Sequence, residues 1–234
     1  MKIKIIIFII TFGMSISAIS QNIDHSDWTN FLKKHVSKEG AVNYISIKAN
    51  DVELNNYLNQ FIKISPKDSW SNNEILAYWI NAYNAFTVKL IIDNYPLKSI
   101  KDIKNPWDQE FIPINGKYIS LNYIEHEILR NMNEPRIHFA IVCASTSCPK
   151  LQNEAFVSEK LDQQLTATTK EFLNDASKNN IEKDKLELSK IFKWFSKDFK
   201  QNSSLIDFLN SYSEITIQSD AKTKYMDYSW ELND

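Results

Sequence analysis

The sequence has 234 residues and a formal net charge of −2 at pH 7, from 27 basic and 29 acidic side chains. No block of like charge stands out, which argues against a nucleic-acid partner and against an electrostatic membrane anchor. Only three glycines occur, and they do not cluster, so the sequence lacks the loops with which nucleotide enzymes cradle phosphates. We therefore expect no cofactor and a small-molecule or peptide-like ligand.

Residues 1–20 have the pattern of a signal peptide. Lys2 and Lys4 form a positive n-region, residues 5–12 a short apolar core, and residues 18–20 a small-x-small cleavage site. The apolar run is too short to span a bilayer of roughly 30 Å. No cysteine follows the cleavage site, which argues against a lipid anchor. We expect an exported protein, periplasmic or extracellular, without a membrane anchor after cleavage.

The segment 21–69 is predicted to be a helical extension that packs on the main domain. Apolar and aromatic residues recur at helical spacing over 24–38 and again over 51–63. Gly40 ends the first helix and Pro66 stops the second. The residues that follow Gly40 predict a short extended piece.

The longest predicted helix covers 71–94. Its apolar residues extend over more than half of its circumference, so we expect it to be buried on most faces. Asn81 and Asn84 lie one turn apart within this apolar surround. A buried amide without partners costs about 1–3 kcal/mol. Two interpretations remain open: both amides bond neighbouring loop backbone, or one of them lines a functional site.

A hairpin and a helix are predicted next. Asn115-Gly116 between two apolar runs is a strong signal for a hairpin over 111–119. Ser120 caps a predicted helix over 121–131, which carries Glu125 and His126 on its flank.

The stretch 136–151 contains both cysteines of the chain. It begins with a β-branched and aromatic run, 137–142, that predicts a buried strand. The strand gives way to a Ser/Thr-rich loop, and Pro149 cannot donate to a sheet. A strand that delivers polar and sulfur atoms into a loop is a common way to present a site.

The C-terminal third is predicted to mix short helices and strands. Helical spacing recurs over 158–176, 189–199 and 204–212. A short strand pair is expected around residues 181 and 185–188, and edge strands are expected at 215–217 and 225–232. Helices and strands do not alternate strictly, which predicts a single α+β domain with several helices around a small mixed or antiparallel sheet.

Several motifs occur in a recognisable order. They are LAYWINAYNA at 76–85, SLNYIEH at 120–126, RIHFAIVCASTSCP at 136–149, LSKIFKW at 188–194 and YSWELN at 228–233. Together they resemble the family called domain of unknown function 547, and we expect the domain to cover 70–234. The resemblance implies a compact α+β domain, common in exported bacterial proteins. It implies no catalytic assignment.

The motif segments supply one set of polar side chains that a single fold can bring together. These candidate site residues are Asn81, Asn84, Glu125, His126, Arg136, His138, Cys143, Ser145, Ser147 and Cys148.

The favoured hypothesis is a thiol- or histidine-assisted hydrolase or transferase acting on an amide-type bond in the cell envelope. A nucleophilic cysteine needs a base or cation nearby. Cys148 is the expected nucleophile, His126 the better base, and Glu125 or Asn81 the group that orients the imidazole. The predicted ligand-binding residues are Asn84, Arg136, His138, Ser145 and Ser147.

The alternative hypotheses also concern Cys143 and Cys148. Two cysteines five positions apart in an exported protein form a disulfide in the simplest case, Cys143–Cys148. That bond removes the nucleophile and favours a non-enzymatic envelope binding module for a peptide or glycan. Its polar-aromatic pocket would include Tyr83 and Trp107, with Trp79 and Trp194 more simply explained as core. The spacing of the cysteines and histidines matches no standard zinc pattern, so we expect no metal site.

Overall fold

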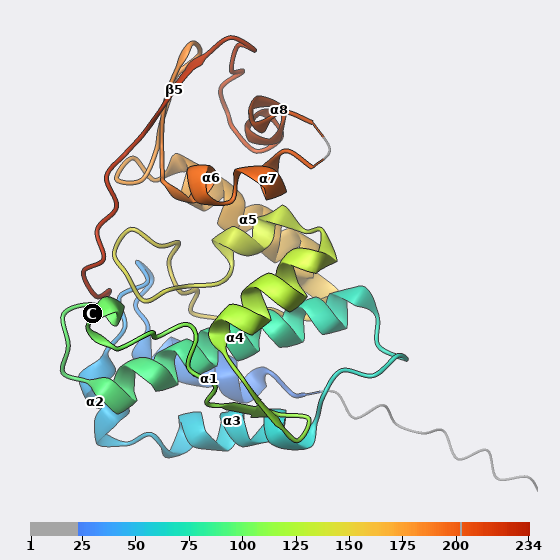
Figure 1. The fold of residues 1–234 in the computed structure, drawn as a ribbon, viewed down its shortest axis with the longest axis vertical. Helices are drawn as coiled ribbons and strands as arrows, with labels where there is room; N and C mark the ends of the chain where they lie inside the picture. Colours follow the sequence, from blue (N-terminus) through green and yellow to red (C-terminus); the bar gives the residue numbers. More distant parts are fainter. Residues whose placement is uncertain (1–22, 202) are drawn as a thin grey trace, which may run out of the picture.

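The computed structural model describes residues 23–201 and 203–234, so the expected signal peptide lies outside the described residues. The described chain forms a helical base from its N-terminal half and a smaller upper part from its C-terminal third (Figure 1). From the upper part the tail returns along one side of the molecule and ends beside α2 (Figure 1).

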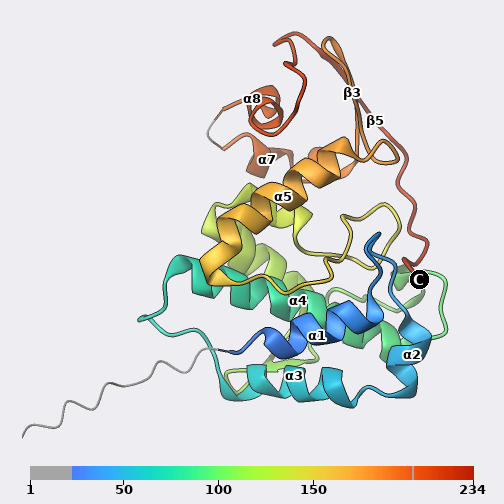
Figure 2. The ribbon, with the colours of Figure 1, turned by 180° about the vertical axis from the view of Figure 1, so that it is seen from behind.

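The N-terminal helices build the base. Their bounds are Ser26–His35 for α1, Tyr44–Ala49 for α2, Val52–Lys63 for α3 and Asn72–Asn94 for α4. All four contribute to one hydrophobic core, and both views show them in the lower half of the molecule (Figures 1 and 2). The helices expected over 24–38, 51–63 and 71–94 are confirmed, whereas α2 was not predicted. The expected extended piece is reduced to an isolated bridge between Val36 and Val42.

α4 is the central element of the base. Ser71 caps it, because its hydroxyl accepts from the Glu74 N–H while the Glu74 carboxylate accepts from the Ser71 N–H. The helix has the length and composition of a membrane span, but most of its residues are buried inside the protein. It therefore serves as a core helix, as its nearly uniform apolar surface predicts.

The predicted hairpin is confirmed as β1 (Ile112–Ile114) paired with β2 (Lys117–Ile119). Asn115 and Gly116 both have positive φ, 53° and 71°, as a two-residue turn of the type I′ class requires. Before it lies a short helical turn, η1 (Ile100–Asp102).

The helix predicted over 121–131 is present but unusually wide. Its main part, η2 (Tyr123–Leu129), is a π-helix, and the N–H of Arg130 bonds to the carbonyl of Glu125 five residues earlier. A tighter turn, η3 (Arg130–Met132), ends it. Such widened turns are frequent at functional sites, and this one carries Glu125 and His126.

The prediction of a strand over 137–142 is wrong. The structure has a 3₁₀-helix there, η4 (Pro135–Phe139), followed by irregular backbone. No strand pairs with this segment among the described residues. The amide of Asn84 takes the place of a neighbouring strand: its Nδ2 donates to the Ala140 carbonyl at 2.9 Å, and its Oδ1 accepts from the Val142 N–H at 3.0 Å. An apolar run of this length indicates burial but does not distinguish a strand from other buried conformations.

The C-terminal part contains the remaining elements. They are η5 (Ser158–Lys160), α5 (Leu161–Asn174), β3 (Asn180–Ile181), β4 (Lys185–Leu188), α6 (Ile191–Trp194), α7 (Ser196–Phe199), α8 (Leu205–Asn210) and β5 (Lys222–Tyr225). β4 pairs antiparallel with β3 and parallel with β5, giving a small mixed sheet. The α+β class is confirmed.

Two expectations for this part need correction. The helix over 189–199 is broken into α6 and α7 at Phe195, whose φ and ψ of −104° and 27° are not helical. The edge strands expected at 215–217 and 225–232 are replaced by β5 and by one isolated bridge between Ser145 and Leu232.

Candidate functional site

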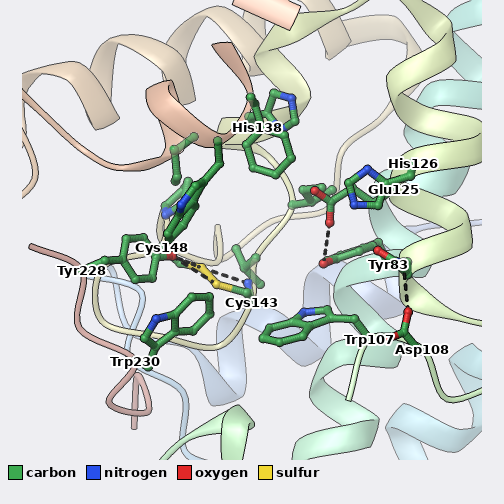
Figure 3. A pocket seen from close by; sticks show the side chains of 17 residues that line it. Tyr83, Trp107, Asp108, Glu125, His126, His138, Cys143, Cys148, Tyr228 and Trp230 are labelled. Carbon is green, nitrogen blue, oxygen red and sulfur yellow. Dashed lines mark hydrogen bonds between the residues drawn. A yellow bond between two sulfur atoms is a disulfide. The ribbon is translucent and has the colours of Figure 1, made fainter. Parts of the chain in front are cut away.

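A pocket of about 300 Å³ lies where the helical base meets the C-terminal part. Figure 3 shows the disulfide, Tyr228 and Trp230 on one side of it and Glu125, His126 and Tyr83 on the other. The polar residues in its wall include Tyr83, Asp108, Asn122, Glu125, His126 and His138, and the aromatic ones are Trp107, Trp194, Phe195, Tyr228 and Trp230.

The aromatic side chains form a continuous wall. The ring centroids of Tyr228 lie 4.8 Å from Trp194 and 4.7 Å from Trp230, and Trp230 lies 5.6 Å from Trp107. Trp194 is 46% exposed, so the expectation that it belongs to the core is wrong. Trp79 is buried in α4, as expected.

The two cysteines are joined in the Cys143–Cys148 disulfide, with their Cα atoms 6.2 Å apart. Both line the pocket. Because a bonded sulfur carries no thiolate, Cys148 is not available as the nucleophile expected of it. The disulfide also closes the Ser/Thr-rich loop, and the C-terminal tail pairs with that loop through the Thr146 N–H and the Glu231 carbonyl at 2.8 Å.

Glu125 projects from η2 into the pocket wall, where its Oε2 accepts from the Tyr83 hydroxyl at 3.1 Å. The other oxygen, Oε1, has no partner among the described residues. Burial raises the pKa of Glu125 to about 7, because removal from water disfavours the charged form; the hydrogen bond from Tyr83 and the charge of Arg130 oppose this only in part. This carboxyl group therefore changes its charge near neutral pH.

A chain of hydrogen bonds joins the two pocket histidines. His138 Nε2 lies 2.8 Å from Asp198 Oδ2, and Arg130 binds both Asp198 oxygens at 2.6 and 2.8 Å. Arg130 also donates to His126 Nδ1 at 2.7 Å. Arginine only donates and a carboxylate only accepts, so His126 accepts through Nδ1 and His138 donates through Nε2. The remaining nitrogen of His138, Nδ1, has no partner among the described residues.

The charges follow from this arrangement. Burial lowers the pKa of His138 and outweighs the opposing hydrogen bond to Asp198. Burial and the charge of Arg130 lower the pKa of His126. Burial alone would raise the pKa of Asp198, but the hydrogen bonds from Arg130 and His138 outweigh it and lower that pKa. At pH 7 the network therefore holds two neutral imidazoles around one arginine–carboxylate pair.

Several predicted site residues lie elsewhere. Asn81 is fully buried, and its amide is occupied by the backbone of Phe156, with Nδ2 donating at 2.7 Å and Oδ1 accepting at 3.0 Å. The amide of Asn84 likewise bonds the backbone of Ala140 and Val142 at the end of η4 and just after it. Of the two interpretations left open, the structure has the one in which both amides bond neighbouring loop backbone. Neither amide lines the pocket, so the site roles predicted for Asn81 and Asn84 are not found.

Of the other predicted ligand-binding residues, His138 lines the pocket, whereas Arg136, Ser145 and Ser147 lie outside its wall. Arg136 is paired with Glu134 at 2.6 Å and Asp162 at 2.9 Å. The Ser147 hydroxyl accepts from the Ser229 N–H at 2.9 Å and so holds the tail. Ser145 is buried behind the pocket, where its hydroxyl donates to Tyr228.

Sequence reasoning missed three groups that shape the site: Arg130, Asp198 and Tyr228. Arg130 follows His126 by four residues, which places both on one helical face, and this spacing was a usable signal. Asp198 and Tyr228 come from the broken helix and the tail. No local pattern in the sequence connects them with His138 or with the cysteines.

Comparison with known proteins gives a family but no activity. Residues 67–173 match the model of the family described as protein of unknown function, DUF547. No curated protein and no solved structure matches the chain. The matched segment contains Tyr83, Glu125, His126, His138 and both cysteines, whereas Asp198 and the tail lie beyond it. Over residues 67–173, the chain is therefore similar to the DUF547 family.

Proposed function

We propose that the pocket is the active site of a histidine- and carboxyl-assisted hydrolase or transferase acting on an amide-type bond. The observation that carries the proposal is the pairing, in one pocket wall, of His138, whose Nε2 is held by Asp198, with Glu125, whose pKa is about 7. Acid–base catalysis usually combines two titratable groups whose environments separate their pKa values. Near pH 7, one is then available as a neutral base and the other as a protonated acid.

The catalytic roles follow from the two atoms that have no hydrogen-bond partner among the described residues, His138 Nδ1 and Glu125 Oε1. His138 accepts a proton from water or from an acceptor nucleophile through Nδ1, and Asp198 stabilises the imidazolium that forms. Glu125 donates its proton to the leaving amine. Disulfide-bonded Cys148 has no part in this chemistry, so the thiol-dependent form of the hypothesis is set aside.

The ligand class follows from the aromatic wall. Trp194, Tyr228 and Trp230 offer apolar faces beside the polar groups, the combination typical of small-ligand sites. A peptide-like compound with an apolar side chain fits this wall. The signal-peptide pattern of the sequence supports the further proposal that the site operates outside the cytoplasm.

The second candidate is a binding module without catalysis. It is favoured by the disulfide, which removes the strongest nucleophile, and by the same aromatic wall. On this alternative the histidine–aspartate–arginine chain only stabilises the fold, as most buried polar networks do.

Model substrates test the proposal. A panel of p-nitroanilides and p-nitrophenyl esters of N-acetylated amino acids is assayed with the wild-type protein and with Glu125→Gln, His138→Asn and Glu127→Gln. Glu127 lies on the same helical turn but is exposed, so its variant is the matched control. We expect hydrolysis by wild type and by the control, and a decrease of about 10²- to 10⁴-fold in the other two variants.

Binding to the same compounds is followed by the fluorescence of the pocket tryptophans. Binding without turnover, at equal affinity in wild type, Glu125→Gln and His138→Asn, supports the binding module. Turnover that is unchanged in Glu125→Gln and His138→Asn contradicts the proposed roles.

A further inference from the structure

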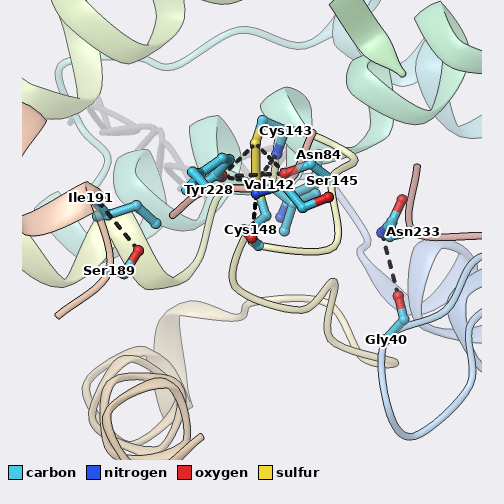
Figure 4. Close-up of a disulfide and its surroundings, with 12 residues drawn as sticks. Gly40, Asn84, Val142, Cys143, Ser145, Cys148, Ser189, Ile191, Tyr228 and Asn233 are labelled. Carbon is cyan, nitrogen blue, oxygen red and sulfur yellow. Dashed lines mark hydrogen bonds between the residues drawn. A yellow bond between two sulfur atoms is a disulfide. The ribbon is translucent and has the colours of Figure 1, made fainter. Parts of the chain in front are cut away.

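The Cys143–Cys148 disulfide is surrounded by hydrogen-bond donors, which a purely structural crosslink does not need. The backbone N–H of Cys143 lies 3.0 Å from Cys148 Sγ, and the Tyr228 hydroxyl lies 3.2 Å from the same sulfur (Figure 4). Ser145 donates to the Tyr228 oxygen at 3.3 Å, which leaves the Tyr228 hydrogen free to point at a sulfur atom. The Tyr228 oxygen also lies 3.3 Å from Cys143 Sγ, and Ser145 Oγ lies 3.4 Å from that sulfur. The backbone N–H is therefore directed at Cys148, whereas the Tyr228 hydroxyl reaches both sulfur atoms.

The two cysteines are not equivalent. Cys148 is 5% exposed, whereas Cys143 is partly exposed, and both line the pocket. A thiol that enters the pocket therefore meets Cys143 as the more accessible residue. Cys148, the less accessible one, has a backbone N–H donor in addition to the shared Tyr228 hydroxyl, and both stabilise a departing negative charge.

We propose that this disulfide is a thiol–disulfide exchange site, at which the thiolate of a small thiol compound attacks Cys143 Sγ and expels Cys148 as a thiolate. The inference goes beyond the proposed hydrolysis and does not depend on it. The pocket volume of about 300 Å³ admits a low-molecular-weight thiol, and its aromatic wall favours one with an apolar portion.

The exchange takes place in two steps, and each step breaks one bond to sulfur and forms another. In the first, the bond between Cys143 and Cys148 breaks, a bond forms between the incoming sulfur and Cys143, and the electron pair leaves with Cys148 Sγ. In the second, another thiolate attacks the incoming sulfur and releases Cys143 as a thiolate. Overall, two thiols are oxidised to one disulfide, and the two cysteines are reduced and take up the two protons.

Tyr228 is well suited to the donor role. Burial raises its pKa to about 12, so the hydroxyl keeps its proton at neutral pH. Hydrogen bonds to a thiolate lower the pKa of the corresponding thiol and make it a better leaving group. The chain has two cysteines in all, so no third thiol competes for the intermediate.

Reaction with glutathione tests the proposal. The folded protein is mixed with millimolar reduced glutathione, quenched at intervals with iodoacetamide, and mapped by mass spectrometry. We expect an early species with glutathione on Cys143 and carbamidomethyl on Cys148. This position is determined on the unmodified protein, so it does not depend on how any variant folds.

Variants test the role of Tyr228. Tyr228→Phe removes the hydroxyl alone and should slow the exchange by about tenfold or more, since a hydrogen bond to a charged group has an effect of at least that size. Tyr118→Phe, at an exposed tyrosine in β2, is the matched control and should react as wild type does.

Three results would overturn the inference: a disulfide that is reduced only after unfolding in urea, glutathione attached to Cys148 instead of Cys143, or equal rates for the two phenylalanine variants. The hydrolase assay is run without thiols, so failure of one proposal is distinguishable from failure of the other.

Discussion

His138 donates its Nε2 hydrogen to Asp198 across 2.8 Å, although 60 residues separate the two in the sequence. Arg130 clamps the same carboxylate from the other side through two hydrogen bonds. This contact joins η4, which belongs to the DUF547 segment, to α7 in the C-terminal part. The geometry of the pocket therefore depends on residues on both sides of the matched boundary.

Asp198→Asn should destabilise the protein by about 2–3 kcal/mol, because it leaves Arg130 without its charged partner. This is less than the ~3–5 kcal/mol of a fully buried pair, since the Arg130 side chain is 28% exposed. Urea unfolding measures the change. The matched control is Asp162→Asn: Asp162 pairs with Arg136 but is 83% exposed, so its loss should change stability by less than about 1 kcal/mol. Equal effects of the two variants would contradict a structural role for the Asp198 contact.

Asn81→Ala should lower stability without changing the pocket. The substitution leaves the N–H and the carbonyl of Phe156 buried without partners, each at about 1–3 kcal/mol, so we expect a total loss of roughly 2–6 kcal/mol. Activity per folded molecule should stay the same, because Asn81 does not line the pocket. A variant that folds normally but loses turnover would restore the catalytic role that the sequence suggested.

Two glycines with positive φ should respond differently to alanine. A Cβ at Gly40, where φ is 88°, would lie 2.3 Å from the Cβ of Lys150, whereas a Cβ at Gly116 has no neighbour within 4 Å. Gly116→Ala should therefore cost only the backbone strain, about 1–2 kcal/mol. Gly40→Ala should cost more, because the loop that follows the disulfide must also move. Thermal unfolding compares the two, and a larger loss at Gly116 would contradict the close approach at Gly40.

Glu125 should make stability depend on pH in an unusual direction. Between its ordinary pKa near 4.5 and its folded pKa near 7, the folded protein keeps a proton that the unfolded chain has released. Stability should therefore fall as the pH rises through this window. Relative to Glu125→Gln, wild type should lose about 1–3 kcal/mol between these two pH values, discounted because the residue is partly exposed. Urea unfolding across the window, with Glu127→Gln as control, measures this; parallel curves for wild type and Glu125→Gln would refute the raised pKa.

Helices with clear apolar periodicity were predictable from the sequence, as α1, α3 and α4 show, and so was the hairpin turn at Asn115-Gly116. These features depend on residues close together in the chain. The segment 137–142 was not predictable, because its backbone partner is the side chain of Asn84 on α4 instead of a neighbouring strand. The apolar residues of this segment indicate that it is buried, but they do not indicate which backbone conformation it adopts.

The candidate site was predictable in part. Glu125, His126, His138 and both cysteines share one pocket, as their motif segments suggested. Asn81 and Asn84 were misassigned, because sequence cannot tell which polar atom a buried amide faces. Asp198 and Tyr228 reach the site through tertiary contacts between remote segments, and such contacts leave no local pattern. Arg130 was missed although its spacing of four residues from His126 is a local signal.

The most direct test of the acid–base account is the pH dependence of kcat/KM for a model amide, measured for wild type and Glu125→Gln. Catalysis needs Glu125 protonated, so the rate should fall as the pH rises through about 7. It also needs His138 neutral, and since burial lowers the pKa of His138, the rate should fall on the acidic side only below the ordinary pKa range of histidine. Glu125→Gln should have a much lower rate without the alkaline decrease. A wild-type profile that stays flat through neutral pH, or an alkaline decrease that persists in Glu125→Gln, would contradict the account.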